Sequence, residues 1–103
     1  MMMNEAAATA LNFVNTHSAD LLQCAKDLIA APSSNPPGDE RAAVDVAKRY
    51  CEALQLGDIQ VLGPRPERPN LICRISSRLP GPRLLLNGHL DTKPPLPLDR
   101  WNT

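Results

Sequence analysis

The stretch that decides the fold of this chain is LLLNGHLDTKPP, residues 84–95. Its run of leucines has no polar alternation, which is the pattern of an interior β-strand buried on both faces. The apolar run stops before Gly88, and a histidine and an aspartate follow at positions 89 and 91. Because residues i and i+2 of an extended backbone point the same way, we expect His89 and Asp91 to share one face.

This pair is typical of a metal site, in which a carboxylate fixes one nitrogen of the imidazole and the metal takes the other. We therefore expect His89 to be a metal ligand and Asp91 to orient it. Two further roles of Asp91 stay open, as a direct metal ligand and as a turn residue bonded to the backbone near Thr92. His89 could equally be a structural histidine at a strand end. The rigid Pro94 and Pro95 follow, and sites often lie where a rigid element meets a loop.

Eleven prolines divide the remainder of the chain into elements, because each cluster interrupts a periodic pattern. Helical spacing of leucine, alanine and isoleucine predicts a helix over residues 18–30, and Pro32 ends it. The preceding residues 6–14 are either helical or a loose arm.

A second helix is predicted to begin at Asp39 and Glu40, whose negative charge suits the positive end of the helix dipole. Its apolar period continues to Leu56, and Gly57 is a favourable residue just past the end. By composition, the loop of residues 33–40 is a connector between the two helices.

Three strand candidates follow the helices, and their residues are 58–62, 70–76 and 83–87. The connector between the last two contains Pro80-Gly81, which favours a turn, so we expect these two strands to form a hairpin. Two helices followed by strands with a leucine-rich final strand predict the opening of an α/β domain.

Composition excludes several classes of function. Eleven basic and eleven acidic residues cancel, so neither nucleic acid nor a membrane surface is an expected partner. No apolar stretch approaches the roughly 20 residues that span a bilayer, and the N-terminus does not resemble a signal peptide. The three cysteines form no Cys-x-x-Cys motif, which argues against a disulfide framework and favours a cytoplasmic location.

Two motifs and one aromatic residue carry a resemblance to a known family. The stretches PSSNPPGDE, residues 32–40, and LLLNGHLDTKPP, residues 84–95, followed by Trp101, resemble the N-terminal quarter of the zinc peptidase/deacylase family. That family includes acetylornithine deacetylase, succinyl-diaminopimelate desuccinylase, aminoacylase and carboxypeptidase G. The similarity runs from about Leu21 to the last residue.

The resemblance implies an α/β catalytic domain built around a mixed sheet and interrupted by a smaller domain often used for dimerisation. It implies two zinc or cobalt ions that activate water against an amide bond, with a glutamate as general base. His89 would bind one ion and Asp91 would orient it. The substrate would be an N-acyl amino acid or a small peptide, and the full-length protein could be a homodimer. Lys93 stands where the family usually has a small apolar residue, which leaves the substrate subtype open.

The resemblance also implies that most of the active site would follow Thr103. Residues 1–16 are then an N-terminal arm or short helix, and residues 17–103 an incomplete part of the catalytic domain. A catalytic zinc needs three protein ligands, so we expect this chain alone to bind the metal weakly and to be inactive. The alternative is a non-catalytic binding or regulatory module that retains the start of the fold.

Overall fold

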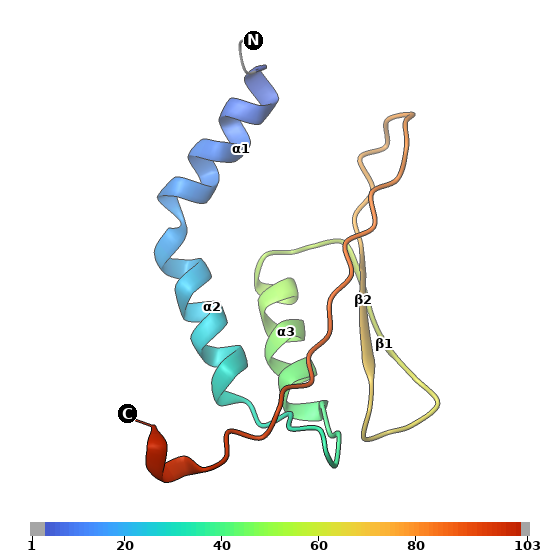
Figure 1. The fold of residues 1–103 in the computed structure, drawn as a ribbon. Coiled ribbons are helices and arrows are strands. Elements are labelled where there is room, and N and C mark those ends of the chain that lie inside the picture. The colour runs from blue at the N-terminus through green and yellow to red at the C-terminus, as the bar shows by residue number, and fades with distance from the viewer. Residues whose placement is uncertain (1–3, 102–103) are drawn as a thin grey trace. The chain divides into compact units, whose positions relative to one another are not determined.

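The computed structural model describes residues 4–101, which form a mixed α/β chain (Figure 1). Within these residues there are three α-helices, a two-stranded antiparallel sheet and a short 3-10 helix at Leu98–Arg100. Internal contacts group the chain into two compact units, one up to Ala30 and one from Ala31 onward. No helix in the described range is both long enough and apolar enough to cross a membrane.

The first unit consists of the helices α1, Glu5–Thr16, and α2, Ser18–Ala30. Helix α1 begins with an N-cap, in which the side chain of Asn4 accepts a hydrogen bond from the backbone N–H of Ala7 at 2.8 Å. Of the two interpretations of residues 6–14, the helix is therefore the one observed. Helix α2 covers the predicted span, and neither helix contains a buried residue.

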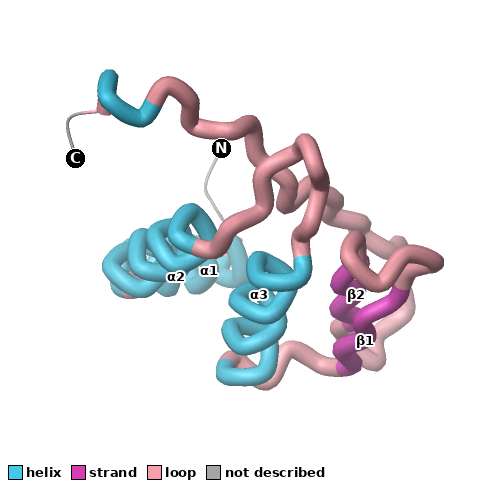
Figure 2. The backbone as a smooth tube through the Cα atoms, turned by 90° about the horizontal axis from the view of Figure 1, so that it is seen from below, coloured by secondary structure: helices cyan, strands magenta, loops and turns pink. Residues whose placement is uncertain are grey.

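The second unit contains helix α3, Arg41–Ala53, and the strands β1, Asp58–Leu62, and β2, Asn70–Arg74. The two strands pair in register, with Asp58 opposite Arg74 and Leu62 opposite Asn70. Helix α3 packs against both strands (Figure 2), and its apolar face carries the buried hydrophobic side chains of the described residues. These side chains are Ala43, Val44 and Val46.

A close backbone approach lies between α3 and β1. Gly57 has φ of +59°, and a Cβ atom at this position would collide with the carbonyl oxygen of Arg74 at the end of β2. Glycine is therefore required here for both its dihedral angle and its lack of a side chain. The helix itself ends at Ala53 rather than at the predicted Leu56, since Gln55 already has a left-handed φ of +53°.

The prediction of a third strand that forms a hairpin with the second is wrong. Residues 83–87 form no strand within the described range, and the partner of β2 is β1, reached through residues 63–69. The connector explains part of the difference. Pro80 and Pro82 have no N–H group to donate to a β-ladder, and Arg78 has a left-handed φ of +61°. The three leucines of the run are consequently 84–86% exposed.

Candidate functional site

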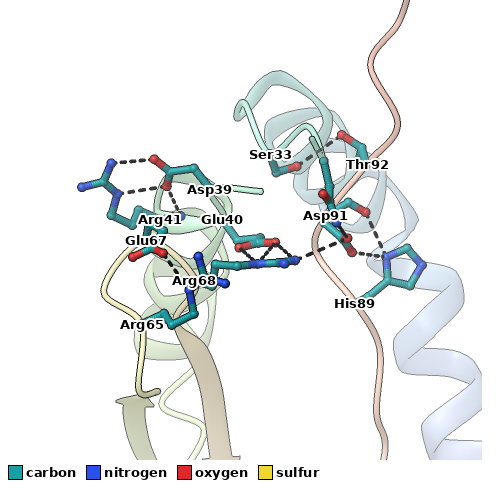
Figure 3. A network of polar contacts seen from close by, with 11 residues as sticks. Ser33, Asp39, Glu40, Arg41, Arg65, Glu67, Arg68, His89, Asp91 and Thr92 are labelled. Carbon is teal, nitrogen blue, oxygen red and sulfur yellow. Dashed lines mark hydrogen bonds and ion pairs between the residues drawn. The ribbon is translucent and has the colours of Figure 1, made fainter. Parts of the chain in front are cut away.

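The proline loop and the histidine segment, which are far apart in the sequence, lie side by side in the second unit. A parallel bridge pairs Ser34 with Thr92. Thr92 donates its N–H to the carbonyl of Ser33 at 3.0 Å, and Asn35 donates its N–H to the carbonyl of Thr92 at 2.8 Å. The side-chain hydroxyls of Ser33 and Thr92 are 3.4 Å apart (Figure 3). The loop is thus more than the helix connector that its composition predicts.

His89 and Asp91 face one another, as their spacing predicts (Figure 3). The Nδ1 atom of His89 lies 3.0 Å from Oδ1 of Asp91 and 2.9 Å from the backbone carbonyl oxygen of the same residue. Because a carbonyl and a carboxylate only accept, these contacts assign the proton to Nδ1. The Nε2 atom is then left with its lone pair, on a side chain that is 85% exposed.

The second carboxylate oxygen of Asp91 has partners of its own. Oδ2 accepts a hydrogen bond from the side-chain amide of Asn35 at 2.9 Å, and Nη2 of Arg68 lies 3.7 Å away. The hydrogen bond from Asn35 is the main reason that the pKa of Asp91 is lowered from its usual value. Burial acts against this lowering, whereas the hydrogen bond from His89 and the charge of Arg68 add to it. Asp91 is therefore an anionic acceptor at neutral pH.

Arg68 is held in turn by Glu40, a mostly buried carboxylate at the start of α3. Nη2 of Arg68 lies 2.7 Å from Oε1 of Glu40, and its Nε atom lies 3.1 and 3.2 Å from the two carboxylate oxygens. Gly38, with φ of +83°, leaves room for the guanidinium, since a Cβ there would lie 3.1 Å from the Cζ atom of Arg68. The contacts with Glu40 are the main cause of the raised pKa of Arg68.

An open pocket of about 340 Å³ adjoins these groups. It is lined by Asn35, His89, Asp91, Thr92 and Lys93. The pocket combines a histidine, an anionic carboxylate and a lysine, so it can accept a polar ligand that needs both acceptors and donors.

The donor set fits one metal ligand rather than a whole metal centre. Among residues 4–101 there is no group of three or more histidine, cysteine, aspartate or glutamate side chains placed to hold one metal ion. The imidazole with its orienting carboxylate has the geometry of a single liganding histidine. A catalytic zinc takes three protein ligands, so further ligands would have to come from outside these residues.

The structure brings together both site residues that the sequence indicates, and it adds three others. The added residues, which complete the polar network around Asp91, are Asn35, Glu40 and Arg68. No motif in the sequence marked them as candidate site residues. Asn35 and Glu40 lie within the proline motif, which is a signal for their region. Nothing in the local pattern of residues 63–69 marks Arg68, because its role depends on contacts between distant segments.

No family model, no curated protein and no solved structure matches this chain. The resemblance to the zinc peptidase/deacylase family therefore rests on the two sequence motifs. In the structure these two motifs contact one another through the bridge between Ser34 and Thr92.

Proposed function

We propose that this chain contributes one ligand, His89, to the metal centre of a hydrolase that cleaves amide bonds in N-acyl amino acids or small peptides. The observation that carries the proposal is the contact of His89 Nδ1 with Asp91 at 3.0 Å, which leaves Nε2 for a zinc or cobalt ion. A ligand held in this way is the usual arrangement of a metal-binding histidine and its carboxylate.

The chain's own residues have two tasks in this proposal. Asp91 keeps the proton of the imidazole on Nδ1, and the pocket beside Lys93 admits the polar part of the substrate. When bound, the metal would polarise the amide carbonyl and lower the pKa of an attacking water. At least two further protein ligands are required, so we propose that the chain is the first part of an α/β catalytic domain and is inactive alone.

We further propose that the enzyme is cytoplasmic and has neither nucleic acid nor a membrane as a partner. The full-length protein could form a homodimer. The balanced charge supports the absence of an anionic polymer partner. The cysteines, all within the described residues, form no disulfide, which is in keeping with a reducing compartment.

The test is a Zn²⁺ titration of the 103-residue chain, in which the ring ¹⁵N signals of its two histidines are monitored by NMR. We expect the Nε2 signal of His89 to shift in fast exchange, with weak affinity, and the His89→Ala variant to lose this response. His17 provides a matched control, because its Nδ1 also contacts a backbone carbonyl, that of Phe13 at 2.8 Å, but no carboxylate. The His17→Ala variant should keep the wild-type affinity.

Two results would contradict the proposal. One is a zinc response that is the same at both histidines. The other is tight one-to-one binding that persists in His89→Ala, which would place the metal elsewhere. A chain that shows no response at His89 would favour the second candidate function, a non-catalytic binding module.

A further inference from the structure

We infer that Asn35 and Arg68 are positioning residues, which act through Asp91 to hold His89 in the tautomer that carries its proton on Nδ1. The inference deepens the proposed function and rests on it for its purpose, since only that tautomer presents Nε2 to a metal. The tautomer can nevertheless be measured in the metal-free chain, so the two ideas can fail separately.

The two carboxylate oxygens of Asp91 have different partners. Oδ1 contacts Nδ1 of His89, whereas Oδ2 contacts the amide of Asn35 at 2.9 Å and faces Nη2 of Arg68 at 3.7 Å. A carboxylate that is held at one oxygen can no longer rotate freely. The other oxygen is therefore directed at the imidazole.

Asn35 is itself hydrogen-bonded to the segment that contains Asp91. Its backbone N–H donates to the carbonyl of Thr92, the residue directly after Asp91, at 2.8 Å. The amide side chain thus reaches Oδ2 of Asp91 from a backbone that cannot move independently of it. Asn35 couples the main chain and the side chain of the same short segment.

Arg68 is held in position by Glu40, independently of its contact with Asp91. Glu40 binds both Nε and Nη2 of the guanidinium, and the same residue donates its backbone N–H to the carbonyl of Glu67 at 3.0 Å. Gly38 allows the close approach of the guanidinium, as described above. Nη2 reaches toward both Glu40 and Asp91, a task suited to the rigid fork of an arginine and unsuited to the point charge of a lysine.

The test measures the ratio of the two neutral tautomers of His89 from its ring ¹⁵N shifts in the metal-free chain. Asp91→Ala defines the lower limit, because it removes both side-chain oxygens and leaves only the contact of Nδ1 with the backbone carbonyl of residue 91. We expect Asn35→Ala and Arg68→Gln each to lower the Nδ1–H to Nε2–H ratio by about two- to five-fold, the size expected for polar and charged contacts that are only partly buried.

Two further variants separate positioning from stability. Arg68→Lys keeps a positive charge for Glu40 but loses the second arm of the fork, so we expect a folded chain with a lowered ratio. Arg65→Gln removes an exposed pair between Arg65 and Glu67 on the same loop, and it should leave the ratio at the wild-type value. Amide spectra of the core around Val44 report whether each variant is folded.

A wild-type ratio in folded Asn35→Ala and Arg68→Lys chains would overturn the inference, as would an equal fall in Arg65→Gln. If the ratio is unchanged but zinc still shifts His89 selectively, the proposed function stands without the inference. If the ratio falls as expected but zinc does not shift His89, the positioning network stands and the metal role does not.

Discussion

At the scale of single residues, the pair of Asp39 and Arg41 makes a direct electrostatic prediction. Arg41 donates from its guanidinium Nε to Asp39 at 2.9 Å, and this hydrogen bond is the main reason that the pKa of Asp39 is lowered to about 2. A lowered pKa stabilises the fold above the ordinary value of 3.8, and this contribution is lost as the pH falls through about 2. We expect Arg41→Gln to return the pKa of Asp39 toward 3.8.

The measurement for this pair is a carboxyl ¹³C titration of both chains. Arg65→Gln serves as the control, because Arg65 pairs with Glu67 and does not contact Asp39. An Asp39 titration curve that is the same in Arg41→Gln and in the wild-type chain would contradict the assignment.

Two glycines give a matched pair of stability predictions. Gly57→Ala places a Cβ against the carbonyl oxygen of Arg74 at a left-handed φ, and neither backbone can move cheaply. We expect a loss of about 2 kcal/mol or more in the free energy of unfolding, measured with urea. Gly88→Ala meets no heavy atom within 4 Å and should change the free energy by less than about 0.5 kcal/mol. Equal losses would mean that the turn after α3 is not closely packed.

At the scale of elements, the stability of the second unit depends on the buried face of α3. Val44 is 1% exposed, whereas Val61 on β1 is 44% exposed. We expect Val44→Ala to lower the free energy of unfolding by about 1–3 kcal/mol, since it removes buried methyl groups and leaves a cavity. Val61→Ala should lower it by less. If urea denaturation gives the two variants the same loss, the packing of α3 on the strands is not the main core.

Helices α2 and α3 and both strands could be predicted from the sequence because their signals are local, whereas residues 6–14 left helix and loose arm open. Helical spacing and Pro32 predict α2, and alternation predicts β1 and β2, although the predicted residues 70–76 extend past the observed end of β2 at Arg74. The pairing of strands is not local, and the prediction failed there. The leucine run of residues 84–86 has the composition of a buried strand, but composition cannot say which strand lies beside it.

The same limit applies to the candidate site. His89 and Asp91 could be predicted as a pair because two positions along an extended chain bring side chains together. Asn35 is 56 residues from Asp91, and Arg68 reaches it from a different loop. Their contacts depend on the folded second unit, so no spacing rule could identify them.

At the scale of the whole molecule, the exposed leucines of residues 84–86 predict self-association. A strand-like apolar segment with unpaired backbone groups is a template for pairing with another chain. We expect Leu85→Lys to reduce concentration-dependent association in sedimentation experiments. Leu54→Lys is the control, because Leu54 is also exposed, at 59%, but lies singly just past the end of α3. An equal effect of both changes would point to a general effect of added charge.

The contacts between Ser33 and Thr92 join residues that are 59 positions apart. Closing so long a loop has an entropic cost, which the packing of α3 and the sheet must offset first. The surroundings of the imidazole therefore exist only in the assembled unit. A synthetic dodecamer with the sequence of residues 84–95 would contain His89 and Asp91 but would lack Asn35 and Arg68, which contact the second oxygen of Asp91. Grafting the motif onto another scaffold would require the proline loop as its second half.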